Sequence, residues 1–70
     1  MVPLAFADIG VKHIVQRIGG SKEVRMHLEN LGFISGDVVT IISSIDGNLI
    51  VQVMESRIAI NKDLAMKIMV

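Results

Sequence analysis

The chain has 70 residues, enough for one small domain, and a chain of this size buries only about 60% of its unfolded surface. It contains no cysteine, which excludes disulfides and thiolate metal sites. Seven basic and seven acidic residues cancel, and Phe6 and Phe33 are the only aromatic residues, so the composition argues against a nucleic-acid-binding protein.

The first twenty residues predict an entry arm followed by one strand. Met1–Ala7 is apolar, but it is short, interrupted by a proline and without a basic leader, so we expect no signal peptide and a cytoplasmic location. Leu4 and Phe6 are expected to close one end of a core. The first strand is predicted over Val11–Ile18, and Gly19–Gly20 gives a flexible break after it.

The next segment predicts a short capped helix. Ser21 can accept a hydrogen bond from an unpaired amide of the first turn. Val24, Leu28 and Leu31 recur at the helical spacing i, i+4 and i+7 and form one apolar stripe. The helix is therefore expected from about residue 21 to residue 31, with this stripe toward the core.

A sharp corner is predicted where this helix ends. With Gly32 as the left-handed residue, Phe33 and Leu28 form the pair that contact each other in a Schellman motif. Gly36 can then take the positive-φ position of a type II turn over Ile34–Asp37. The chain is expected to leave this turn as a strand.

The second half predicts a hairpin, a further strand, a helical turn and a last strand. The β-branched run Asp37–Ser44 predicts a strand, Asp46–Asn48 a turn and Leu49–Met54 the returning strand. After these, Arg57–Ile60 predicts a short strand, Lys62–Ala65 a helical turn with an Asn61 cap, and Met66–Val70 a closing strand. About five short strands leave many unpaired edges, which closure into a barrel removes. We predict a mainly β fold, an SH3-like small β-barrel with one inserted α-helix, as a single domain over residues 1–70.

Apolar residues make up 51% of the chain and charged residues 20%, which leaves two interpretations open. One is a barrel core rich in valine and isoleucine, and the other is an apolar surface kept exposed for a partner. The pattern Val38, Val39, Ile41, Ile42 is typical of a strand covered on both sides. On the returning strand, the face of Ile50, Gln52 and Met54 is a candidate exposed apolar strip.

The sequence resembles the FeoA family from Leu4 to Val70, most specifically at Leu31–Gly36 and Ile58–Ala65. FeoA proteins are small cytosolic proteins that accompany the ferrous iron transporter FeoB. The resemblance implies an SH3-like barrel and a role in ferrous iron uptake through contact with FeoB. The family usually has proline where this chain has Ser35, and proline would fix the turn more firmly.

No catalytic motif or phosphate loop is present, so we expect neither an enzyme nor a cofactor. His13 and His27 lack a second histidine or a carboxylate at ligand spacing, so no metal site is expected, although a weak divalent ion at one of them stays open. Because FeoB hydrolyses GTP, an arginine supplied in trans is a further hypothesis. Arg25 is the best placed for this role, but a surface pair with Glu29 is the simpler interpretation.

We expect contact with the cytosolic face of FeoB, with no membrane insertion and no nucleic acid, and weak self-association stays open. The expected partner-binding residues are Arg25, Met26, Glu29, Phe33, Ile34, Ile50 and Met54. The alternative function is a C-terminal SH3-like regulatory domain of a DtxR-type iron-dependent repressor. Such a repressor needs upstream DNA-binding and metal-ligand domains, which a chain starting at Met1 is not expected to have.

Overall fold

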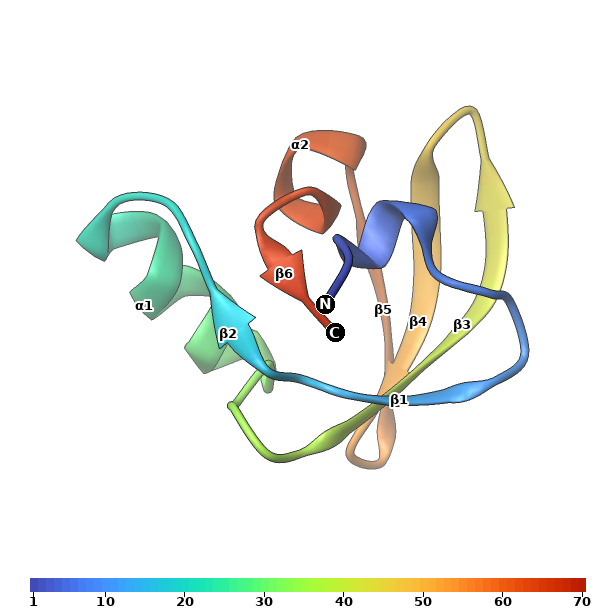
Figure 1. The fold of residues 1–70 in the computed structure, drawn as a ribbon, viewed down its shortest axis with the longest axis horizontal. Coiled ribbons are helices and arrows are strands. Elements are labelled where there is room, and N and C mark those ends of the chain that lie inside the picture. The colour runs from blue at the N-terminus through green and yellow to red at the C-terminus, as the bar shows by residue number, and fades with distance from the viewer.

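The computed structural model describes residues 1–70 and contains six strands in two sheets, together with two α-helices and one turn of 3-10 helix (Figure 1). In chain order, the elements are η1 (Leu4–Phe6), β1 (Lys12–Ile14), β2 (Arg17–Ile18), α1 (Lys22–Leu31), β3 (Val38–Ile45), β4 (Asn48–Val53), β5 (Ser56–Ile60), α2 (Lys62–Ala65) and β6 (Ile68–Met69). One antiparallel sheet has the order β1-β3-β4-β5, and β2 pairs with β6 in the other. The predicted fold class, mainly β with one inserted helix, is confirmed.

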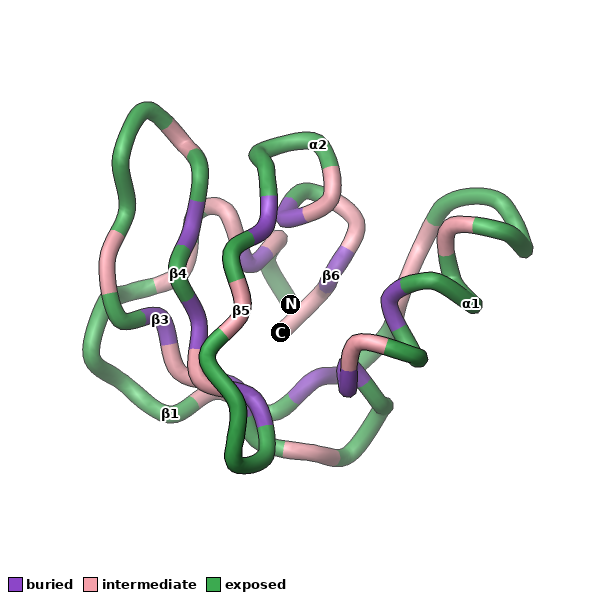
Figure 2. The backbone as a smooth tube through the Cα atoms, turned by 180° about the vertical axis from the view of Figure 1, so that it is seen from behind, coloured by how far each residue is buried: buried purple, intermediate pink, exposed green.

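The hairpin of β3 and β4 forms the centre of the larger sheet. Asp46 and Gly47 both have positive φ, 52° and 82°, as a two-residue primed turn requires. The strands pair with Val39 opposite Val53, and a bulge follows Ile41. In Figure 2, buried and exposed segments alternate along β4, as its period-two pattern predicts.

The single strand predicted over residues 11–18 is wrong, because the chain forms two short strands there in different sheets. Val15 lies between them, where its amide donates to the carbonyl oxygen of Asp37 at 2.9 Å and its own carbonyl accepts from the Gly36 amide at 2.8 Å. The next amide, that of Gln16, donates instead to the carbonyl oxygen of Met69 at 2.8 Å. The backbone therefore changes partners from β3 to β6 at this point.

Both ends of helix α1 follow the sequence prediction. Ser21 Oγ accepts from the Val24 amide at 3.2 Å, and Gly32 ends the helix with φ 111°. The Phe33 amide donates to the carbonyl oxygen of Leu28 at 3.0 Å, the six-to-one bond of a Schellman motif. The type II turn is also present, with Gly36 at φ 95°.

Twelve buried residues form one apolar core between the two sheets, η1 and the helices: Leu4, Val15, Leu28, Phe33, Val39, Ile41, Leu49, Val51, Val53, Ile60, Ala65 and Ile68. The expectation that Phe6 helps to close this core is wrong, because its side chain is 65% exposed. The tight turn of η1 directs Leu4 inward and leaves Phe6 on the outer side.

The C-terminal segment closes the smaller sheet and joins the two chain ends. Asn61 Oδ1 accepts from the Leu64 amide at 2.9 Å, which confirms the predicted cap of α2. The last strand is shorter than predicted and covers only Ile68–Met69. Val2 and Val70 exchange two backbone hydrogen bonds of 2.8 Å, so the termini lie side by side, as Figure 1 shows.

Candidate functional site

The surface carries more large apolar side chains than the core. Fourteen are exposed: Met1, Val2, Phe6, Ile9, Val11, Ile14, Met26, Ile34, Val38, Ile42, Ile45, Ile50, Met54 and Met66. The core accounts for twelve residues. The apolar composition therefore fills the core and also leaves apolar side chains exposed, and a partner for them stays a prediction.

Part of this apolar surface gathers on the outer face of the four-stranded sheet. Ile14 of β1 lies directly opposite Val38 of β3, and both are exposed. Ile42 is exposed at the bulge of β3, and Ile50 and Met54 are exposed on β4 and just after it. The expectation that β3 is covered on both sides is therefore wrong, because no element of the chain packs over this face. We call these five side chains the outer sheet face.

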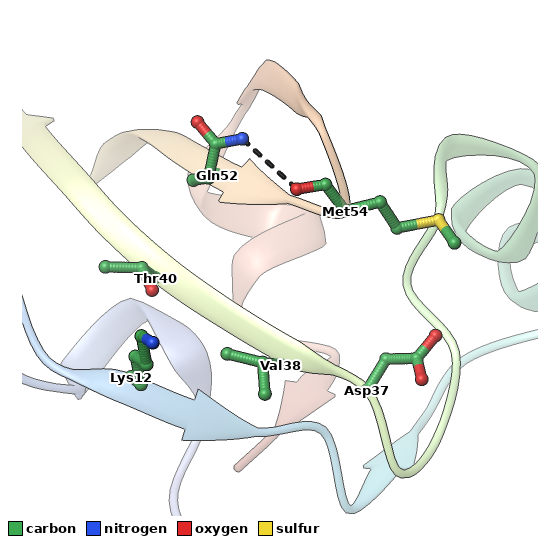
Figure 3. Close-up of a pocket in the computed structure, with 6 residues that line it drawn as sticks. All are labelled: Lys12, Asp37, Val38, Thr40, Gln52 and Met54. Carbon is green, nitrogen blue, oxygen red and sulfur yellow. Dashed lines mark hydrogen bonds between the residues drawn. The ribbon is translucent and has the colours of Figure 1, made fainter.

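A hollow of about 420 Å³ lies in the outer sheet face (Figure 3). Its lining comes from β1, β3 and the end of β4: Lys12, Asp37, Val38, Thr40, Gln52 and Met54. Gln52 Nε2 donates to the carbonyl oxygen of Met54 at 3.2 Å. The hollow thus has two apolar walls, an amide and a hydroxyl, with an ammonium and a carboxylate among its lining groups.

Met54 connects this face with the corner at the end of α1. It begins the two-residue turn between β4 and β5, where Val53 pairs with Ser56, and it has φ 53°. Its Sδ lies 3.6 Å from the position that a Cβ would occupy on Gly32. Ile34 lies two residues after Gly32, and its side chain is 45% exposed.

The expected helix residues lie on a separate surface. Met26 is two residues from buried Leu28, about 200° around the helix, so its side chain points away from the barrel and is 52% exposed. Arg25 Nη1 donates to the carbonyl oxygen of Gly20 at 3.0 Å. This bond takes the place of the expected pair between Arg25 and Glu29, which is also exposed.

Of the seven expected partner-binding residues, the fold brings Ile50 and Met54 onto one face and places the Ile34 corner beside it. Arg25, Met26 and Glu29 remain apart on α1. The expected exposure of Phe33 is wrong, because its side chain is fully buried. Its backbone closes the Schellman motif, and this turns the ring into the core with Leu28.

The sequence reasoning missed three apolar members of the outer sheet face: Ile14, Val38 and Ile42. A signal was present, because Val38, Thr40 and Ile42 alternate as Ile50, Gln52 and Met54 do. What the sequence lacked was the register that sets Lys12 opposite Thr40 and Thr40 opposite Gln52.

The two histidines lie apart from any cluster of ligands. His13 Nε2 donates to the carbonyl oxygen of Asp8 at 2.9 Å, and His27 is exposed on α1. No group of three or more histidine and carboxylate side chains converges to hold a metal ion. Both helices are too short to cross a bilayer as an apolar span.

Known proteins match this chain over nearly its whole length. A family model of the FeoA domain matches residues 2–70. A protein of Methanocaldococcus jannaschii, described as an Fe(2+) transport protein A, is 39% identical over 70 residues, which is 100% of this chain and 85% of that protein.

Solved structures agree with the family match. The crystal structure of an iron uptake regulatory protein, FeoA, has 33% identity and a TM-score of 0.86, over 96% of this chain and 89% of that chain. FeoA of Stenotrophomonas maltophilia, complexed with zinc and described as an SH3 domain protein, has 22% identity and a TM-score of 0.80, over 94% and 85% of the two chains. At this identity the second likeness shows the fold alone, which is the predicted SH3-like barrel. Because the family model spans almost the entire sequence, the chain belongs to the FeoA family, the SH3-like accessory proteins of ferrous iron transport.

Proposed function

We propose that the chain is an interaction module that docks on the cytosolic face of the FeoB GTPase-transporter and modulates its activity. The observation that carries this proposal is the outer sheet face, where five large apolar side chains lie uncovered on one side of a rigid sheet. Exposed apolar side chains are ordinarily scattered, whereas several gathered on one face of a sheet indicate an interaction surface. Family membership supplies the process, ferrous iron transport.

The energetics of this face suit docking. Full burial of an isoleucine or methionine side chain contributes about 1.5–3 kcal/mol, so burial of the exposed part contributes about 1 kcal/mol for each residue. Most of this face stands on strands whose inner side chains are in the core, so the surface is already ordered before it binds. A preformed surface loses little conformational entropy on association.

The test is an equilibrium binding measurement between the purified chain and its cognate FeoB in detergent. Ile50→Asp and Met54→Asp should each weaken binding about tenfold or more, because each places a charge in an apolar contact. Met66→Asp is the matched control, since Met66 is 38% exposed and Ile50 is 37% exposed, but Met66 follows α2 and lies outside the four-stranded sheet. Far-ultraviolet circular dichroism should be unchanged in all three variants.

The helix surface and the corner are tested separately. Met26→Asp and Ile34→Asp should also weaken association if the partner covers both surfaces. If binding survives these two but not Ile50→Asp and Met54→Asp, the contact is confined to the outer sheet face. If binding survives all four variants, neither of these surfaces is the contact with FeoB.

Modulation is measured as the rate of GTP hydrolysis by FeoB with and without a saturating amount of the chain. A trans arginine contributes about 10³–10⁵-fold to hydrolysis, so Arg25→Ala would abolish a stimulation that depends on it. Unchanged stimulation in Arg25→Ala would mean that Arg25 does not act on GTP hydrolysis and has only its structural hydrogen bond to the Gly20 carbonyl.

A further inference from the structure

A row of polar side chains crosses the outer sheet face from one edge to the other. Lys12 of β1 lies opposite Thr40 of β3, Thr40 lies opposite Gln52 of β4, and Gln52 lies opposite Arg57 of β5. We call these four residues the polar row. A cation therefore stands at each end of the row, with a hydroxyl and an amide between them.

Apolar side chains flank the polar row on both sides. On one side, Ile14 and Val38 lie opposite each other, two residues along their strands from Lys12 and Thr40. Met54 lines the hollow together with Val38 on that side. On the other side, Ile50 lies opposite Ala59. Two residues of strand span about 7 Å, so the apolar rows stand about 14 Å apart, with the polar row between them.

Gln52, in the middle of the polar row, can leave water and keep its hydrogen bonds. The Gln52 amide is satisfied at both ends, since its Nε2 donates to the Met54 carbonyl at 3.2 Å and its Oε1 accepts from Arg57 Nε at 3.3 Å. Burial of the amide would therefore leave neither of its atoms without a partner, and an unpaired atom is the costly case. The Lys12 ammonium and the outer nitrogens of Arg57 remain free for a partner.

The polar row itself carries two positive charges and no negative charge. Four strands spaced at about 4.8 Å place the two cations about 14 Å apart. The nearest acidic residue along β3 is Asp37, three residues before Thr40 and so about 10 Å from the row. Arg57 uses Nε on a neutral amide, which leaves its charge uncompensated.

We infer that the polar row selects an acidic amphipathic helix of the partner, laid across the strands along the row. This inference rests on the proposed docking of the outer sheet face. A helix with side chains is about 10–12 Å wide, which fits between two apolar rows about 14 Å apart, and an extended segment is too narrow to contact both. Two carboxylates two to three turns apart on that helix match the spacing of Lys12 and Arg57.

The test uses the chain with cognate FeoB in detergent, and it measures the dissociation constant over a range of NaCl concentrations. The double variant Lys12→Glu, Arg57→Glu should weaken binding about tenfold or more and reverse the salt dependence, because pairing becomes repulsion and added salt then screens that repulsion. Arg17→Glu and Lys22→Glu, exposed cations of β2 and α1, are matched controls and should stay within about threefold.

A second measurement identifies the partner helix. A carbodiimide joins an amine to a carboxylate that it already contacts, so Lys12 should cross-link to an aspartate or glutamate of FeoB, and mass spectrometry locates that residue. The inference predicts a site on a helix with a second acidic residue two to three turns away. Cross-links from Lys12 to a loop or an extended segment would overturn it.

The outcomes separate the two proposals. If the wild-type chain binds, loses binding with Met54→Asp, and is unaffected by the double charge reversal, the polar row has no selective role while the docking proposal stands. If the wild-type chain does not bind FeoB at any salt concentration, both are wrong.

Discussion

Replacement of Phe33 by alanine tests whether this ring belongs to the core or to a binding surface. Phe33 is fully buried, and phenylalanine-to-alanine changes in cores cost about 3–5 kcal/mol through lost burial and the cavity left behind. A domain of 70 residues has a free energy of unfolding of only about 4–10 kcal/mol. Phe33→Ala should therefore remove about half of the stability, with the midpoint of thermal unfolding lower by at least about 12 °C.

The assay is urea unfolding followed by circular dichroism, with the adjacent Ile34→Ala as control. Ile34 is exposed, so this variant should change the free energy of unfolding by less than about 1 kcal/mol. If Phe33→Ala is already unfolded in buffer, Phe33→Leu gives a measurable intermediate loss of about 1–2 kcal/mol. If Phe33→Ala lowers the free energy of unfolding by less than about 1 kcal/mol, the Phe33 ring is not part of the core and the assignment is refuted.

The remaining predictions concern caps and turns and use the same urea assay. Ser21→Ala and Asn61→Ala should each cost about 1 kcal/mol, since each removes the side-chain acceptor of a first-turn amide; no loss in either would mean that water caps the helix equally well. Ser35→Pro should stabilise by about 0.4–1 kcal/mol, because Ser35 is the second residue of a type II turn and its amide donates to no backbone carbonyl; a destabilised variant would contradict that turn type. Gly36→Ala should cost about 1–2 kcal/mol through backbone strain at φ 95°, since a Cβ there would meet no atom within 4 Å. Gly36→Asn should cost less, because asparagine tolerates the left-handed region, and equal losses would indicate that the added side chain makes an unfavourable contact.

The features predicted correctly from the sequence are those with a local physical cause. The Ser21 and Asn61 caps, the Gly32 corner and the Asp46–Gly47 turn each depend on a few adjacent residues and on one backbone requirement. The alternation of Leu49, Val51 and Val53 needs only a covered inner face to become buried. Propensity and position are sufficient for such features, so their boundaries could be predicted within a residue or two.

The features that could not be predicted depend on contacts between distant segments. The break between β1 and β2 exists because successive amides, those of Val15 and Gln16, donate to the carbonyl oxygens of Asp37 and Met69, which lie far away in the sequence. The burial of Phe33 and the exposure of Phe6 follow from which side of a tight turn faces the core. The candidate site belongs to this class as well, since its residues from β1, β3 and β4 become neighbours only through the sheet register.

The register also bears on which molecule can cover the outer sheet face. With equal numbers of basic and acidic residues, the chain has no net charge to keep its copies apart, so an uncovered apolar face would ordinarily favour self-association. If two copies stacked these faces about a twofold axis along the polar row or perpendicular to it, the row would lie on its own copy. Lys12 would then meet either Lys12 or Arg57 of that copy, and like charges brought together without water are costly. In both arrangements, the two cations proposed to select an acidic helix would disfavour a second copy on this face.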